Sequence, residues 1–203
     1  MVMSPKRESI FQAAIGLFAT HGFENTSMAQ ITKAAGAAEG TVFYHFKSKT
    51  RLFTAILEDT RELLVRELSQ LVDQKAAGAG LELLSETIAA YLSLATEQRE
   101  RFLILQRPHA YEQALVDPGC SQQLSELYDT IIRVFERAIE LGVSDGSMRP
   151  VDVHKAALIV FSLLEGLLRL ETNNVYAPAA LYEEALEMCR RMLAADPRSD
   201  DHA

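Results

Sequence analysis

The side chains best suited to chemistry in this chain lie between Gly36 and Lys49. Val42 and Phe46 stand four residues apart there, which predicts a short helix with one buried side. The exposed side of that helix and the residues directly after it offer small, acidic, aromatic and basic groups, namely Ala38, Glu39, Gly40, Thr41, Tyr44, His45, Lys47 and Lys49. A lysine ammonium can meet a phosphate, and an exposed helix face can reach base edges. The pattern therefore indicates contact with nucleic acid.

Two preceding helices are needed to position this segment. Apolar residues at helical spacing between Ile10 and Phe18 predict a first helix, closed by Gly22. Ser27 begins a second helix, and Gln30 three residues later completes a capping box. Gly36 supplies the positive φ angle that a tight turn between the second and third helices requires. This arrangement is a helix-turn-helix, although a helix-glycine-helix alone is also common in all-α proteins.

Residues 27–57 resemble the signature of the TetR family of transcriptional regulators. The resemblance rests on a serine cap, an Ile-x-x-Ala-Ala-Gly turn, a Gly-Thr-x-aromatic-x-x-Phe recognition helix and a Lys-x-Lys-x-x-Leu start to a fourth helix. The first helix fits as well, so the resemblance extends over about residues 5–64. It implies a dimeric DNA-binding regulator with a helical C-terminal domain that binds a small effector.

The resemblance also implies which residues contact double-stranded DNA. Ser27 and Lys49 would bind phosphates, and Lys47 adds a second ammonium beside them. Gly40 and Thr41 would let the recognition helix approach base edges. The aromatic side chains that would meet the backbone or the bases are Tyr44 and His45.

Two positions depart from the family pattern. Ala38 stands where the family often has serine, so a capping hydroxyl is lost. Glu39 stands where lysine is common, so a cation is lost. The Glu39 carboxylate can interact favourably with the helix dipole or accept a hydrogen bond from cytosine N4, although its charge repels phosphate.

The rest of the chain predicts helices and no strand, so the fold class is all-α with about nine helices. Ser48 caps a long fourth helix, whose apolar positions continue to Leu71 and which would link the two domains. Later helices are expected at about 81–97, 100–107, 121–141, 152–171 and 178–194, with breaks at the prolines and glycines between them. We expect a DNA-binding domain over residues 1–50, an effector-binding and dimerisation domain over 51–195, and a mobile tail over 196–203.

The helix expected at 152–171 is apolar on nearly all sides, so both sides must be covered. One cover is its own domain, and the other is the same helix of a second subunit, with the last helix completing a four-helix contact. The alternative is a buried central helix in a monomer. The residues expected at the contact are Phe161, Leu164, Leu168, Leu181, Leu186 and Cys189. Such a homodimer would read a near-palindromic operator, with recognition helices roughly 34 Å apart.

Aromatic residues and one histidine recur along the middle helices, and such residues can line an apolar pocket with polar handles. They are equally typical of a helical core. The residues expected to bind a small effector of unknown identity are Tyr91, Phe102, His109, Tyr111, Tyr128 and Phe135. In proteins of the TetR type, effector binding moves the fourth helix and spreads the DNA-binding heads.

Charge is unevenly distributed. Six basic and three acidic residues lie in the first 57 positions, although the whole chain has a net charge of −8. A small basic head on an acidic body suits a protein that touches DNA at one end. The first eight residues lack the apolar stretch of a signal peptide and no apolar run approaches 20 residues, so we expect a cytoplasmic protein without a membrane partner.

Other classes have less support. The chain has no glycine-rich phosphate loop, no nucleophile motif and no metal-spaced His/Cys cluster, so we expect no enzyme, cofactor or metal site. The two cysteines are far apart and predict buried, reduced thiols. The leading hypothesis is a repressor released by a small molecule. The alternative is a DNA-bound adaptor whose C-terminal domain binds a protein.

Overall fold

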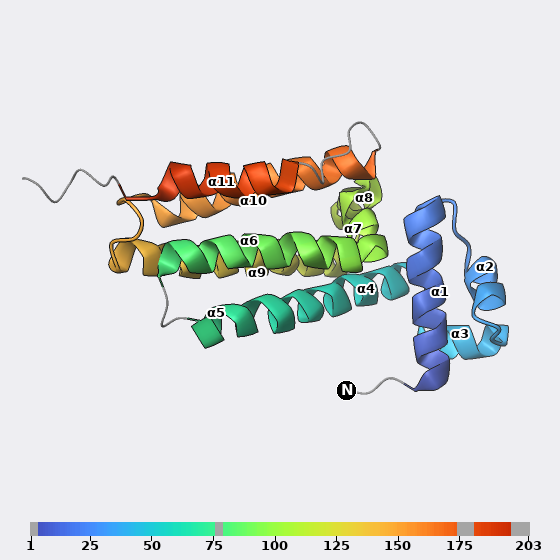
Figure 1. Ribbon diagram of the computed structural model, residues 1–203. Coiled ribbons are helices and arrows are strands. Elements are labelled where there is room, and N and C mark those ends of the chain that lie inside the picture. Colours follow the sequence, from blue (N-terminus) through green and yellow to red (C-terminus); the bar gives the residue numbers. More distant parts are fainter. Residues whose placement is uncertain (1–3, 76–78, 174–180, 196–203) are drawn as a thin grey trace, which may run out of the picture. The chain divides into compact units, whose positions relative to one another are not determined.

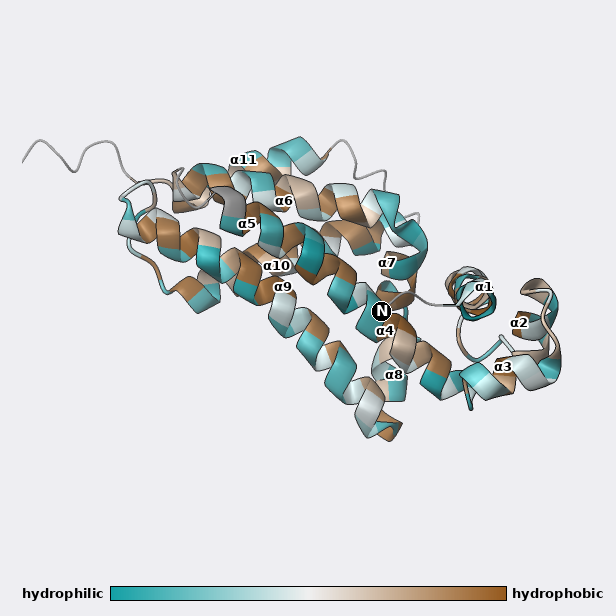
Figure 2. Cartoon of the chain, turned by 90° about the horizontal axis from the view of Figure 1, so that it is seen from below, coloured by the Kyte–Doolittle hydropathy of each residue, from teal (hydrophilic) through white to brown (hydrophobic). Residues whose placement is uncertain are grey.

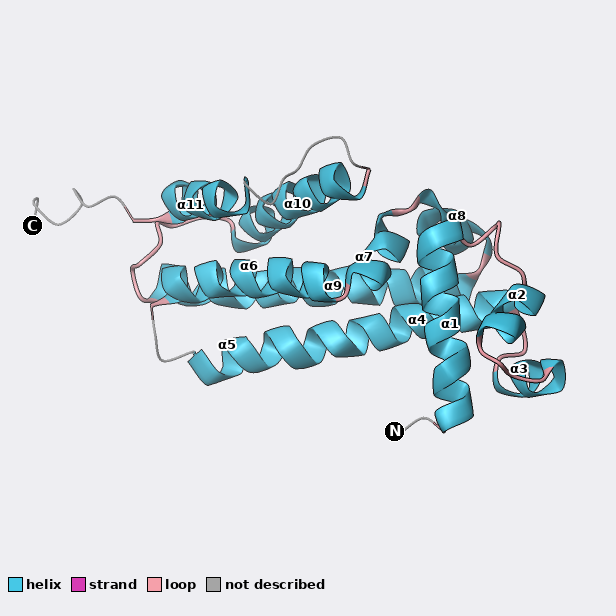
Figure 3. Ribbon diagram, turned by 45° about the vertical axis from the view of Figure 1, so that its right-hand side comes forward, coloured by secondary structure: helices cyan, strands magenta, loops and turns pink. Residues whose placement is uncertain are grey.

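The computed structural model describes residues 4–75, 79–173 and 181–195. These residues form helices joined by short loops (Figure 3), with one isolated antiparallel bridge between Met148 and Ala194. The predicted all-α class is confirmed. The tail predicted over residues 196–203 lies outside the described residues.

The chain divides into two compact units. The first comprises residues 1–62 and 98–127, and the second comprises residues 63–97 and 128–203. The first unit therefore combines the predicted helix-turn-helix with residues 98–127 from the middle of the sequence. The functional boundary expected between residues 50 and 51 stays a prediction, since the compact units have other limits.

The first unit holds the N-terminal helices and part of the middle of the chain. Its elements are α1 (Pro5–His21), α2 (Met28–Ala34), α3 (Glu39–His45), most of α4 (Lys49–Leu64), α7 (Arg99–Gln106), α8 (Pro108–Val116) and the first turns of α9 (Pro118–Ser144). Helix α1 lies against α2, α3 and α7 (Figure 1). Helix α8 differs from the sequence expectation: Pro108, which predicts a break between helices, occupies the first turn of this helix.

Phenylalanine rings fill the core of the first unit. The centroid of Phe23 lies 5.5 Å from that of Phe18 and 5.1 Å from that of Phe53. Phe11 stacks on Phe46 at 6.2 Å. Each of these rings is at most 5% exposed. Because they come from α1, α4 and the loops beside α2 and α3, the rings fix these elements as one body.

Arginines attach α7 and the loop after it to α1 and α4. Arg101 pairs with Asp59 of α4 at 2.7 Å, and its guanidinium carbon lies 5.9 Å from the centre of the Phe11 ring. Arg107 donates to the carbonyls of Ala19 and Thr20 at 2.7 and 3.3 Å. These carbonyls belong to the last turn of α1, where intrahelical partners run out. The contact holds the end of α1.

The long fourth helix is confirmed in outline. Helix α4 continues through a π-helical turn, η1 (Val65–Ser69), into α5 (Gln70–Lys75). Apolar residues at Leu52, Ile56, Leu64 and Leu68 are buried along it. The predicted break begins at residues outside the described part, and Gly80 then opens the next helix.

The second unit contains α6 (Gly80–Glu97), the rest of α9, α10 (Val153–Thr172) and α11 (Tyr182–Leu193). Helix α11 lies against both α6 and α10 (Figure 1). The helices carry hydrophobic and hydrophilic bands along their length (Figure 2). A Cβ on Gly80 would lie 2.0 Å from the backbone nitrogen of Gly142, so only glycine permits this approach of α6 to α9.

A carboxylate fixes the same end of α6. Asp145 accepts hydrogen bonds from the backbone N–H groups of Gly80 and Ser147 at 2.7 and 2.8 Å. Hydrogen bonds from the side chain and backbone of Ser147, and from the backbone of Gly80, lower the pKa of Asp145. The start of α6 is thereby joined to the loop after α9.

Candidate DNA-binding interface

The second helix begins as the sequence predicts. The Ser27 hydroxyl accepts from the backbone N–H of Gln30 at 3.2 Å, and the Gln30 side chain accepts from the backbone N–H of Ser27 at 2.6 Å. The capping box is therefore confirmed. Ser27 remains exposed at the surface of the first unit, and its contact with phosphate stays a prediction.

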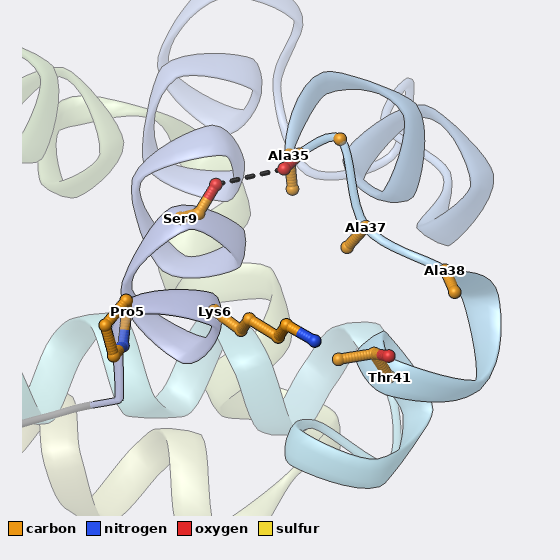
Figure 4. Close-up of a pocket in the computed structure, with 8 residues that line it drawn as sticks. Pro5, Lys6, Ser9, Ala35, Ala37, Ala38 and Thr41 are labelled. Atoms are coloured by element: carbon orange, nitrogen blue, oxygen red, sulfur yellow. Dashed lines mark hydrogen bonds between the residues drawn. The ribbon is translucent and has the colours of Figure 1, made fainter.

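The turn between α2 and α3 is held by α1. Gly36 has a φ of 59°, the left-handed conformation that the sequence predicts for it. The Ser9 hydroxyl of α1 donates to the carbonyl of Ala35 at 3.0 Å (Figure 4). The backbone N–H of Ala37 donates to the Thr32 carbonyl at 3.1 Å. The turn is thus fixed from both sides, which determines where α3 starts.

Helix α3 buries the inward side that the sequence predicts, and it exposes three of the five residues expected on its outward side. Val42 is 0% exposed and Phe46, its C-cap residue, is 4% exposed. Tyr44 is 81% exposed, and its ring centroid lies 5.2 Å from that of His45. Glu39 and Gly40 are exposed as well, whereas Thr41 and His45 are half-buried. A single aromatic side chain this exposed, on a short helix packed from behind, can contact a partner without rearrangement of the core.

The N-terminus of α3 has no side-chain cap. Ala38 occupies the N-cap position and makes no side-chain hydrogen bond there. Glu39 follows in the first turn, where a carboxylate favours the helix dipole. Both departures from the family pattern therefore lie on the exposed start of the helix.

The two lysines after α3 differ in environment. Lys47 is exposed. The ammonium of Lys49 donates to the carbonyl of Phe23 at 2.8 Å and lies 4.2 Å from the centre of the Phe23 ring. Lys49 therefore has a structural contact that its spacing in the sequence does not reveal. Its predicted contact with phosphate stays a prediction that would use its remaining N–H groups.

The structure adds two features that the sequence analysis missed. A groove of about 310 Å³ lies beside the turn and is lined by residues of α1, the turn and α3, among them Lys6, Ala37 and Thr41 (Figure 4). Phe43 of α3 is 43% exposed beside Tyr44. The groove has no local signal in the sequence, because its lining comes from α1, the turn and α3, whereas the aromatic position of the signature is a signal for Phe43.

The predicted effector-binding residues lie in both units. Phe102, His109 and Tyr111 belong to the first unit, where Phe102 is buried and Tyr111 is 40% exposed. The imidazole Nδ1 of His109 lies 2.9 Å from the Glu112 carboxylate. The role of these three residues in effector binding stays a prediction.

The other three predicted residues lie close together in the second unit. The ring of Tyr91 packs edge-on against Phe135 at 6.0 Å and against Phe161 at 6.4 Å. Tyr128 lies 5.6 Å from Phe161. The Tyr91 hydroxyl donates to the Glu165 carboxylate at 2.7 Å. We name these four aromatic residues and the carboxylate of Glu165 the aromatic cluster.

The residues expected at the subunit contact face different ways. Leu164, Leu168 and Cys189 are 0%, 5% and 1% exposed, so they fill the core of their own unit. Phe161 belongs to the aromatic cluster, and Leu186 is half-buried. Of the six, only Leu181 is largely exposed, at 44%. The apolar residues that α10 and α11 expose most are instead Ile159, Leu163 and Met188, at 55%, 37% and 57%.

Among the residues described there is no candidate for a metal site, a membrane span or a nucleophilic cysteine. No group of three or more His, Cys, Asp or Glu residues there could hold a metal ion. No described helix is both long and apolar enough to cross a membrane. Burial, followed by the charge of Asp117, raises the pKa of the Cys120 thiol to about 11. Burial also raises the pKa of Cys189, so neither thiol is activated as a nucleophile.

Known proteins resemble both the N-terminal segment and most of the full length of this chain. Residues 10–56 match the family model for bacterial regulatory proteins of the tetR family. The HTH-type transcriptional regulator AcrR of Shigella flexneri is 32% identical over 179 residues, which cover 85% of this chain and 79% of that protein.

Solved structures share the fold. A bacterial regulatory protein in the tetR family from Rhodococcus RHA1 has a TM-score of 0.80 at 25% identity, covering 96% of this chain and all (100%) of that one. The transcriptional regulator FadR from Bacillus subtilis, solved in complex with stearoyl-CoA, has a TM-score of 0.76 at 19% identity, covering 90% and 96%. With the family match and the geometry of α1 to α3, these likenesses show that the chain belongs to the TetR family of bacterial transcriptional regulators.

Proposed function

We propose that the protein is a homodimeric repressor that binds a near-palindromic operator through α3 and releases it when a small effector binds. The observation that carries the proposal is the outward face of α3. Tyr44 is 81% exposed there, while Val42 behind it is fully buried. A rigid helix with an exposed polar and aromatic face suits the major groove, which admits an α-helix.

The proposed DNA contacts fall into two kinds. Ser27 and Lys47, which precede and follow α3 in the chain, are exposed and would bind phosphates, as would Lys49. Tyr44 and the exposed start of α3 would meet the bases. Glu39 would accept a hydrogen bond from cytosine N4, the base-edge donor that suits a carboxylate.

A second copy would cover the exposed apolar residues of α10 and α11. Ile159, Leu163 and Met188 are side chains that a monomer leaves in water. Gly166 is exposed on α10, and no atom of the described residues outside its own helical turn lies within 4 Å of the position of a Cβ added to it. Glycine costs a helix about 1 kcal/mol relative to alanine, so close approach of a partner helix would account for it. Two-fold symmetry would then place two recognition helices on one operator.

The aromatic cluster is the proposed centre of effector binding in the second unit. It offers apolar rings and one carboxylate, the combination of apolar surface and few polar groups that is typical of small-molecule sites. The relative FadR was solved with stearoyl-CoA, a precedent for a small ligand on this fold. An effector releases DNA only if it binds the released state more tightly than the DNA-bound state.

The test begins with selection of duplexes from a random pool by the purified protein, followed by gel-shift measurement of the enriched sequence. We expect an inverted repeat bound at least about 1,000-fold more tightly than random duplex. Tyr44→Ala should lose this preference, whereas Leu115→Ala, which removes an exposed side chain of α8, should keep it. A protein that selects no sequence would refute the proposal.

Fractionated small molecules from the source cell then test release. We expect a fraction below about 1 kDa to weaken operator binding, by roughly 5- to 150-fold for a typical coupling between two sites. If only a protein fraction changes DNA binding, the C-terminal domain is an adaptor and the small-effector part of the proposal is wrong.

A further inference from the structure

Phe43 is unlike the other phenylalanines of the first unit. Its side chain is 43% exposed, whereas the others are at most 5% exposed, namely Phe11, Phe18, Phe23, Phe46, Phe53 and Phe102. It lies on α3 between the fully buried Val42 and the fully outward Tyr44. Phe43 is therefore partly packed on the unit and partly open to solvent, on a helix that we propose meets DNA.

The chemistry of the ring limits what it can contact. Phenylalanine has no donor or acceptor, so it can neither bind a phosphate oxygen nor hydrogen-bond to a base edge. Tyr44, by contrast, has a hydroxyl that can do both. Among the groups that base pairs expose in the major groove, the apolar one is the C5 methyl of thymine.

The helix can come close enough for such a contact. Gly40, one turn before Phe43, is exposed, and in the part of the chain that the structure describes no atom beyond its own helical turn lies within 4 Å of the position of a Cβ added to it. Together with the small Ala38 and Thr41, it leaves Glu39 as the one long side chain in the first turn of α3. On the side of Gly40 the backbone can therefore approach the base edges, which would bring the Phe43 ring within reach of a methyl group.

We propose that Phe43 is a specificity-determining residue that contacts a thymine methyl in each half of the operator. The inference rests on the proposed function, because it requires α3 to lie in the major groove. The preference for thymine at one base pair of each operator half would then depend on an apolar contact with Phe43.

The test changes the DNA first, so that folding of a variant is not at issue. Each thymine of the selected operator is replaced in turn by uracil, which removes the methyl and keeps every hydrogen-bonding group. We expect one symmetric pair of positions at which the replacement weakens binding about fourfold per half-site, or about 15-fold for both, the loss expected for one buried methyl group each.

The protein variant closes a double-mutant cycle. Phe43→Ala should bind the thymine and uracil operators equally, while Tyr44→Phe should keep the full sensitivity to uracil at that position. Circular dichroism melting verifies that each variant is folded. If no thymine is sensitive, or if Phe43→Ala keeps the wild-type ratio, Phe43 does not read thymine although specific DNA binding stands. Failure to select any operator would instead remove the proposed function itself.

Discussion

Lys49 is expected to stabilise the protein as well as to contact DNA, and replacement by methionine tests this. The substitution keeps most of the alkyl stem and removes the ammonium. The ammonium donates to the carbonyl of Phe23 at 2.8 Å and lies 4.2 Å from the centre of the same residue's ring. Phe23 in turn packs on Phe18 and Phe53, so the contact ties the start of α4 to the core of the first unit.

The expected loss follows from these two interactions. A hydrogen bond from a charged donor contributes about 1.5–3 kcal/mol to the free energy of unfolding. A cation over an aromatic ring contributes about 0.5–2 kcal/mol, depending on its exposure. Both belong to one half-buried ammonium and are not additive, so we expect Lys49→Met to lower the free energy of unfolding by about 2 kcal/mol. For a chain of this length that corresponds to a fall in Tm of about 4–8 °C.

The assay is thermal unfolding followed by circular dichroism at one protein concentration, with Lys47→Met as the matched control. Lys47 is exposed, so its removal should change the free energy of unfolding by less than about 0.5 kcal/mol. It should nevertheless reduce the slope of log affinity for DNA against log salt by about one per half-site, or about two for a dimer on its operator. A Lys49→Met protein as stable as the wild type would refute the contact with Phe23.

Three further predictions concern the second unit. Because hydrogen bonds lower the pKa of Asp145 in the folded state, it contributes stability above the pKa of the unfolded chain, and this is lost as pH falls through the folded pKa. Asp145→Asn should therefore flatten the fall in Tm on acidification below about pH 5, and an unchanged pH profile would count against this contribution. Leu163→Asp should give monomers in light scattering, whereas a persistent dimer would place the contact on another face. In that monomer, Gly166→Ala should raise the free energy of unfolding in urea by about 1 kcal/mol, and no gain would mean that the glycine is needed within the chain.

The helix-turn-helix could be predicted from sequence because its signals are local. The capping box at Ser27, the turn at Gly36 and the buried pair of Val42 and Phe46 each depend on residues within a few positions of one another. Pro108 shows the limit of local signals. Proline can end a helix, but it is also common in the first turn of one. Pro108 predicts a break, whereas in the structure it lies in the first turn of α8.

Other features depend on contacts between distant parts of the chain. The partner of Lys49 is a carbonyl 26 residues earlier, which its spacing does not reveal. Helix α10 is apolar on most sides. Its pattern of apolar residues therefore does not indicate which side packs on its own unit. The leucines at 164 and 168 turned inward, while Ile159 and Leu163 stayed exposed.

The discontinuity of the first unit bears on how the protein can be dissected. A fragment ending at Glu62 would lack residues 98–127, and with them the guanidinium groups of Arg101 and Arg107 that hold α4 and the end of α1. The buried ring of Phe102 would be missing from its core as well. Chimeras that transplant the DNA-binding head onto another regulator should therefore carry both segments, since a graft of the N-terminal stretch alone would leave apolar surface bare.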